Sequence, residues 1–322
     1  MEHPELQRQK ARNLIQSMLL VVTMSLFCGY LAWLVGGPGL ALFTLALVIL
    51  GYQFNPALSP HLILRLYRGR PLTPREAPEL YRVLEQLAHR AGLPATPTLY
   101  YIPSDVMNAF ATGSEREAVI ALSDGLLRRL DLRELTGVLG HEISHIRNRD
   151  LRVMGFADLV SRLTGSLSLV GQLLLFINLP LLMMGGYHIA WLPIMVLLFA
   201  PTVSALIQLA LSRNREYDAD LGAVELTGDP KGLAQALGKM ERYQGRVLEQ
   251  ILWPGQRIPD PSLLRTHPPT EERIRRLMAL LDHPERLGRP LPPLGVRGEG
   301  VLASQLAADP FKPRWHRTGT WF

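Results

Sequence analysis

The residues His141-Glu142-Ile143-Ser144-His145 combine the side chains that a catalytic zinc site needs. If this segment is helical, His141 and His145 lie four residues apart on one face, where two imidazoles can bind one zinc ion. Glu142 lies beside them, where it can act as the general base that activates a water molecule. The spacing therefore predicts a zinc-dependent hydrolase with one Zn2+ per chain.

A second motif, Arg215-Glu216-Tyr217-Asp218-Ala219-Asp220, can complete this site. No histidine follows His145 closely, and a carboxylate on a second helix is then the usual third ligand, so we assign this role to Glu216. Asp220 lies one helical turn beyond Glu216. That spacing suits a carboxylate that accepts the free ring N–H of a ligand histidine, above all His141.

Two long runs without Asp, Glu, Lys or Arg, residues 14–64 and 163–212, flank the zinc motif. Each run is long enough for two spanning helices of about 20 residues. Turn residues interrupt the first run at 36–39 and the second around 178–180 and 185–186. We therefore expect four transmembrane helices in two hairpins. Their expected spans are roughly 14–35, 40–56, 160–180 and 187–212.

Basic residues flank both runs, and neither predicted hairpin tip carries one. The positive-inside rule then predicts a multi-pass protein of the inner (plasma) membrane, with both termini and the active site in the cytoplasm. These flanks also explain most of the net charge of +6, and no basic–aromatic recognition motif suggests a nucleic-acid partner. The single cysteine, Cys28, excludes an intramolecular disulfide and fits a reducing compartment.

The charged remainder of the chain predicts a mainly helical domain with a small β-sheet. Capping-box patterns at Thr73-Pro74-Arg75-Glu76 and Asp131-Leu132-Arg133-Glu134 predict two helix starts, and the second helix carries both histidines to about residue 150. Further helices are expected at 231–244 and 271–282, and strands at 98–102, 107–112 and 118–122, the last two joined by a turn at 113–116.

Four motifs together resemble those of the HtpX-type membrane zinc metalloproteases, gluzincins related to the CAAX prenyl proteases. They are the segments 108–113, 141–145, 215–220 and 266–270, in the family's order. The resemblance covers about residues 5–285 and implies an α+β membrane protein, with a gluzincin-like zinc protease domain on four transmembrane helices. It also implies an endopeptidase for misfolded or damaged membrane proteins, so the expected partners are unfolded or membrane protein substrates and the lipid bilayer.

The resemblance implies a role for individual residues as well. His141, His145 and Glu216 would bind zinc, and Glu142 would be catalytic. Asn108 and Ala109 would lie on the edge strand where the substrate peptide docks as an added strand. His267 would stabilise the oxyanion of the tetrahedral intermediate.

The expected domain organisation alternates between membrane and cytoplasm. It comprises an N-terminal transmembrane hairpin (1–64), the first part of the protease domain (65–158), a second hairpin (159–212), the second part of the protease domain (213–287) and a C-terminal tail (288–322).

Two alternative functions stay open on the sequence. A prenyl-protein (CAAX-type) protease would use the same zinc chemistry, although four spans are few for that group. A membrane chaperone or scaffold would instead hold a structural zinc ion, closed by a fourth protein ligand. Structural alternatives also remain for single residues. Glu216 and Asp220 could lie on a solvated helix face or pair with Arg213 or Arg215. Asn108 could be a polar residue next to a turn, and His267 an exposed loop histidine before two prolines.

Overall fold

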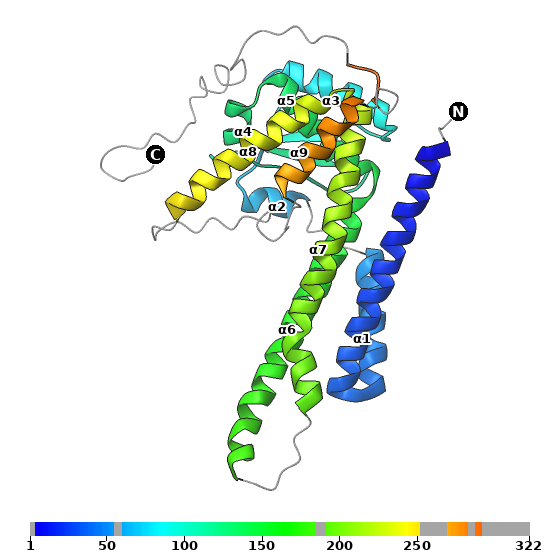
Figure 1. Cartoon of the computed structure of the whole chain (residues 1–322), viewed down its shortest axis with the longest axis vertical. Coiled ribbons are helices and arrows are strands. Elements are labelled where there is room, and N and C mark those ends of the chain that lie inside the picture. Colours follow the sequence, from blue (N-terminus) through cyan, green and yellow to red (C-terminus); the bar gives the residue numbers. More distant parts are fainter. Residues whose placement is uncertain (1–3, 55–59, 185–190, 252–268, 283–286, 292–322) are drawn as a thin grey trace. The chain divides into compact units, whose positions relative to one another are not determined.

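A computed structural model describes residues 4–54, 60–184, 191–251, 269–282 and 287–291 of the 322-residue chain (Figure 1). The chain divides into two compact units. The first contains Met1–Leu58 and Asn148–Glu216, and the second contains Ser59–Arg147, Tyr217–Ile258 and the part from Pro269 onward. One boundary falls inside a continuous helix, so the backbone of Glu216 runs directly into Tyr217 of the second unit.

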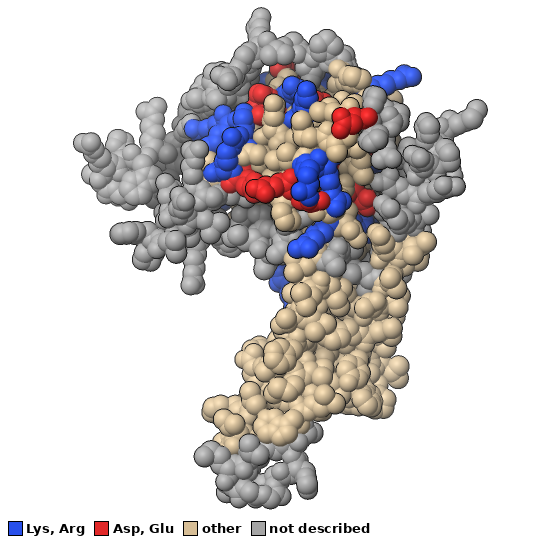
Figure 2. All heavy atoms as spheres, viewed as in Figure 1, with Lys and Arg blue, Asp and Glu red and all other residues tan. Residues whose placement is uncertain are grey.

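Three long apolar helices supply the first unit: α1 (Pro4–Phe54), α6 (Asp150–Met184) and the greater part of α7 (Trp191–Thr227). Among the described residues, these three helices are long and apolar enough to cross a membrane. Large apolar side chains face outward, among them Phe176 at 76% and Leu192 at 70% exposure. On the face seen in Figure 2, these helices carry no charge over most of their length, as lipid-facing helices require.

Helix α1 is broken where the sequence predicts a turn. Gly36 and Gly37 have non-helical backbone angles, and φ of Gly37 is +71°, a value that glycine adopts at little cost. Figure 1 shows the chain folding back at this point. A Cβ on Gly29 would lie 3.1 Å from the Leu45 side chain, so the two arms of α1 pack closely against each other.

Helix α6 differs from the predicted span in two ways. It begins at Asp150 instead of about residue 160, because the helix before it already ends at Arg147 and Arg149 adopts a left-handed φ of +58° between them. It also continues through Pro180, where we expected a break. The proline removes one backbone hydrogen bond near the helix end, which is a tolerable loss there. The predicted turn at 185–186 lies outside the described residues.

Helices α6 and α7 pack through small and polar side chains. The Gln208 side-chain amide donates to the Ala157 carbonyl and to the Ser161 hydroxyl. Ser168 Oγ donates to the Leu198 carbonyl at 3.2 Å. Such contacts are typical of helix pairs in membranes, where apolar side chains gain nothing by leaving lipid for protein.

The second unit contains a four-stranded mixed sheet in the order β1-β2-β4-β3. Its strands are β1 (Arg70–Pro71), β2 (Thr98–Ile102), β3 (Ala109–Thr112) and β4 (Val119–Ser123). β2 pairs in parallel with β4, and β3 pairs with β4 in antiparallel register, with Ala109 opposite Leu122. The expected strands are present to within two residues, β1 was not foreseen, and β3 lies at an edge of the sheet.

The second unit also contains the helices α2 (Pro60–Leu66), α3 (Pro78–Ala91), α4 (Asp124–Arg129), α5 (Leu132–Arg147), α8 (Pro230–Ile251) and α9 (Thr270–Ala279), followed by the 3-10 turn η2 (Leu280–Asp282). The predicted capping box opens α5, because Asp131 N donates to the Glu134 carboxylate at 2.9 Å and Glu134 N donates to the Asp131 carboxylate at 2.8 Å. α5 packs against α3, α8 and β3, so the helix with both histidines lies in the centre of the unit.

The first predicted capping box forms the same reciprocal bonds but does not open a helix. Thr73 N donates to Glu76 at 2.7 Å and Glu76 N donates to Thr73 at 3.4 Å, yet α3 begins only at Pro78. The box closes a turn, because Ala77 has an extended φ of −138° and precedes a proline, which disfavours helical geometry at that residue.

Candidate metal centre

The helices α5 and α7 approach each other closely through glycine. A Cβ on Gly222 of α7 would lie 2.5 Å from Ser144 Oγ of α5, and a Cβ on Gly140 would lie 3.0 Å from the Thr227 methyl group. Ser144 Oγ is itself held on the Gly140 carbonyl at 2.8 Å. The small residues therefore permit a helix spacing at which side chains of α5 and α7 meet.

His141, His145 and Glu216 meet at this contact. One ligand atom of each lies within 4.8 Å of the others, and all three side chains are buried. The two Nε2 atoms are 3.1 Å apart and the imidazole rings are perpendicular. Although Glu216 closes the first unit, it lies on the continuous helix α7, one turn before Asp220, so the local helix sets its position.

This donor set fits a zinc ion. Two nitrogens bound tetrahedrally at 2.0–2.1 Å from zinc would be about 3.3 Å apart, close to the observed separation of the histidine Nε2 atoms. Two imidazoles and one carboxylate are also a known ligand set of catalytic zinc, which keeps a fourth position open. Among the described residues, His141, His145 and Glu216 form a group of three without a fourth member.

Asp220 lies behind His141, on the side away from His145. Its Oδ1 is 3.0 Å from His141 Nδ1. Arg273 of α9 donates to the same carboxylate twice, from Nε to Oδ2 at 2.8 Å and from Nη2 to Oδ1 at 2.7 Å. An acceptor at Nδ1 favours the tautomer whose Nε2 lone pair points at the metal cluster.

The charge of Asp220 is maintained by Arg273. Burial by itself would raise the pKa of Asp220, but the Arg273 charge and hydrogen bonds, followed by the bond from His141, lower this pKa below its ordinary value. Asp220 lies beyond Ser212, where the uncharged stretch of α7 ends, so this ion pair is outside the apolar segment. The carboxylate is therefore ionised at neutral pH and accepts the ring proton.

Arg273 was missed by the sequence analysis, although a signal exists. It lies four residues before Leu277, which is 1% exposed, so both occupy the buried face of α9. An arginine on the buried face of an amphipathic helix requires an anionic partner. Arg276 of the same helix lies over the Tyr217 ring at 3.8 Å, so α9 holds α7 at two points next to the cluster.

A second buried ion pair lies beside Glu216. The Arg215 guanidinium contacts the Asp150 carboxylate at the start of α6, and the two residues are 3% and 0% exposed. Of the alternatives considered for this motif, a solvated helix face does not match the burial of Glu216 and Asp220, at 2% and 4% exposure.

The remaining predicted site residues are placed as follows. Glu142 is 8% exposed on α5, next to His141 in the sequence. Asn108 directly precedes the edge strand β3; its N–H donates to Ser123 Oγ at 2.9 Å and its carbonyl accepts from Ser123 N at 3.0 Å. Ala109 begins β3 and is half-buried. His267 lies outside the described residues.

The chain is similar to several known proteins. Peptidase family M48 matches residues 74–281. A "Protease HtpX homolog" from Desulfatibacillum aliphaticivorans is 34% identical over 82% of this chain and 89% of the relative. Homologues of the same description from Methylibium petroleiphilum and Thermodesulfovibrio yellowstonii are 35% and 34% identical, covering 85% and 83% of this chain and 99% and 98% of theirs. The crystal structure of S. mikatae Ste24p aligns with a TM-score of 0.47 and 23% identity, over 83% of this chain and 67% of that one.

Proposed function

Since the chain belongs to peptidase family M48, we propose that it is a zinc endopeptidase that cleaves misfolded or damaged membrane proteins in protein quality control. The coarser activity needs no proposal: the chain is a membrane metalloprotease, given the family match, the HtpX relatives and the three apolar helices. The resemblance predicted from the four motifs is thereby confirmed. The identity of the metal, the substrates and the roles of single residues are what we infer further.

The observation that carries the proposal is the buried cluster of His141, His145 and Glu216 with Asp220 behind it. When bound, zinc supplies a Lewis acid that polarises the peptide carbonyl and lowers the pKa of a water molecule toward neutrality. The three ligand side chains would hold the ion, and Asp220 would keep His141 in the binding tautomer. Glu142 takes the proton of the attacking water and passes it to the leaving amine.

The substrate peptide would bind in extended form along β3, from Asn108 and Ala109 onward. Support comes from the edge position of β3 and from its packing against α5, the helix that carries Glu142. Backbone hydrogen bonds to an edge strand recognise a peptide with little regard to its side chains, which suits a protease that handles many unfolded proteins. His267 would stabilise the oxyanion.

For the membrane arrangement we propose four spans in an inner membrane, with both termini and the active site in the cytoplasm. The break of α1 at Gly36–Gly37 supports two spans within that helix. The basic residues that flank the apolar runs support the orientation. Protease segments 65–158 and 213–287 would then share one compartment, as a single active site requires.

The decisive experiment compares wild type with Glu142→Gln, both purified in detergent, for zinc content and for cleavage of casein and of an unfolded membrane protein. We expect about one zinc per chain in both proteins and cleavage by the wild type alone. Activity that survives both chelation and the substitution would reject the proposal. Cleavage restricted to a prenylated C-terminal peptide would favour a prenyl-protein protease, and X-ray absorption showing four protein ligands would favour a structural zinc site.

A further inference from the structure

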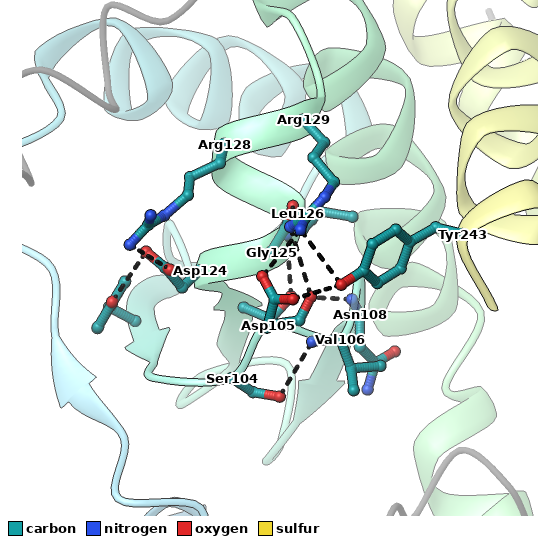
Figure 3. Close-up of polar contacts among 12 residues, drawn as sticks. Ser104, Asp105, Val106, Asn108, Asp124, Gly125, Leu126, Arg128, Arg129 and Tyr243 are labelled. Carbon is teal, nitrogen blue, oxygen red and sulfur yellow. Dashed lines mark hydrogen bonds and ion pairs between the residues drawn. The ribbon is translucent and has the colours of Figure 1, made fainter. Parts of the chain in front are cut away.

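A second polar cluster uses none of the metal-site residues and joins three separate elements (Figure 3). Asp105 lies between β2 and β3, Arg129 ends α4, and Tyr243 lies on α8. Arg129 Nη2 donates to Asp105 Oδ1 at 2.9 Å and to Tyr243 Oη at 3.2 Å, and the Tyr243 hydroxyl donates to the other Asp105 oxygen. The three side chains thus close a triangle, which we call the Asp105 latch.

The Asp105 latch adds a contact from a distant part of the chain to segment 104–108. Other contacts of this segment come from residues 123–125. In segment 104–108, the Ser104 carbonyl accepts from Gly125 N at 2.9 Å, and Asn108 exchanges two hydrogen bonds with Ser123. A Cβ on Gly125 would lie 1.9 Å from the Asp105 carbonyl oxygen, so the segment rests directly on the start of α4. Tyr243 comes from 138 residues further along the chain and ties the same segment to α8.

The protonation states in the latch are well defined. Burial by itself would raise the pKa of Asp105, but the bonds from Tyr243 and Arg129 and the charge of Arg129 together lower this pKa below its ordinary value. The bond to Asp105, followed by burial, raises the pKa of Tyr243. At neutral pH the carboxylate is therefore ionised and the phenol keeps its proton, so both bonds to Asp105 are charge-assisted.

The Asp105 latch acts by restricting the position of Asp105 more than by adding electrostatic stability. The Asp105 side chain is 70% exposed, and an exposed ion pair by itself contributes little stability. Arg129 also lies over the Tyr243 ring, with its guanidinium carbon 4.2 Å from the centroid. The stacked ring and the two donors together restrict the position of the Asp105 carboxylate. They therefore also restrict the backbone at Asp105, which lies three residues before Asn108.

This position links the latch to substrate binding. Segment 104–108 ends at Asn108 and continues directly into Ala109, the first residue of the edge strand β3. A peptide that adds to β3 binds more tightly when the strand is already ordered, because less conformational entropy is lost on binding. We propose that Tyr243, acting through Asp105, is a positioning residue that sets the affinity for extended peptide substrates. The inference rests on the proposed function.

The test uses Tyr243→Phe in the full-length protein with a fluorogenic peptide. Removing the phenol hydrogen bond should raise KM about threefold to tenfold and leave kcat within about twofold, with unchanged zinc content. In a Glu142→Gln background, fluorescence anisotropy should show the same factor in the Kd of a labelled peptide. Asp105→Asn should act alike, and the double variant should be no worse than either single one, because both changes open the same triangle.

Two matched controls separate positioning from general loosening. Lys239→Met removes a bond of 2.8 Å from the same helix, one turn earlier, to Glu134. Tyr81→Phe removes a hydroxyl that donates to the Leu72 carbonyl at 2.6 Å. Both should keep the wild-type KM. A wild-type KM in Tyr243→Phe, or an equal rise in Lys239→Met, overturns the latch alone. A wild type without chelator-sensitive cleavage overturns the proposed function and the latch with it.

Discussion

Arg273 binds Asp220 through two hydrogen bonds of 2.8 and 2.7 Å, one to each carboxylate oxygen, and the same carboxylate contacts the Nδ1 of His141. One buried acidic side chain of α7 thus contacts both α9 and α5. Because all three residues are nearly excluded from water, their charges are poorly screened, and the orientation of the His141 ring depends on a residue of another helix.

Replacing Arg273 by methionine should therefore weaken zinc binding. The substitution removes the charge and the hydrogen bonds that keep the buried Asp220 carboxylate ionised and oriented, so its hold on the His141 ring weakens, and zinc affinity should fall about 10-fold to 100-fold. A competition titration with a fluorescent zinc chelator measures this. Arg275→Met is the control, because the Arg275 side chain is 74% exposed on the same helix. Equal zinc affinity in the two variants would contradict the role of Arg273.

Zinc binding should also be sensitive to a single methyl group added at Gly222. In Gly222→Ala, the new Cβ would overlap Ser144 and push α7 from α5, so zinc content and peptidase activity should fall together. Gly238→Ala on α8 adds the same methyl group at 3.6 Å from Ile274, an ordinary contact, and should be neutral. Metal analysis after dialysis against a weak chelator distinguishes the two, and full zinc retention by Gly222→Ala would show that the helix contact is not tight.

The Arg215 and Asp150 pair should behave as a buried ion pair. Arg215→Met alone leaves the buried carboxylate of Asp150 without this partner. The free energy of unfolding should therefore fall by about 3–5 kcal/mol. The double variant Arg215→Met with Asp150→Leu should recover much of that loss, since neither charge remains. Thermal unfolding in detergent measures both. An additive loss in the double variant would argue against the pairing.

Acid stability should depend in part on Asp229, which receives a bond of 2.7 Å from Arg133 of α5 and one of 3.3 Å from Gly232 N. Burial would raise the pKa of Asp229, but the bonds and charge of Arg133 lower it overall. The carboxylate therefore stabilises the fold above its unfolded pKa of about 3.9, and this contribution is lost as pH falls through the lower folded pKa.

In Asp229→Asn, the unfolding midpoint should depend less on pH in the acid range than it does in the wild type. Its unfolding midpoint should lie below that of the wild type at pH 7, and the two curves should converge as pH falls below about 4. Arg133→Met should reproduce the effect, because it removes the main cause of the shift. A constant difference between wild type and Asp229→Asn from pH 7 to pH 3 would contradict this assignment.

Much of the local structure is predictable because it depends on neighbours in the chain. The interval from His141 to His145 places both rings on one helical face whatever surrounds them. The reciprocal bonds of Asp131 and Glu134 need only three residues between them, and the strand at 98–102 follows from its composition and flanking turns. The errors also have local causes, such as the extended Ala77 that delays α3 and the left-handed Arg149 that starts α6 early.

The family, the types of the candidate metal ligands and the apolar helices can be predicted from the order of residues alone, because motif spacing and runs without charge are properties of contiguous residues. Three contacts depend instead on packing between distant segments: Glu216 meets the two histidines, Arg273 pairs with Asp220, and Tyr243 bonds to Asp105. Periodicity tells which side chains share a face of a helix. Which other face they meet depends on the packing of segments far apart in the chain, where glycines such as Gly222 set the distance.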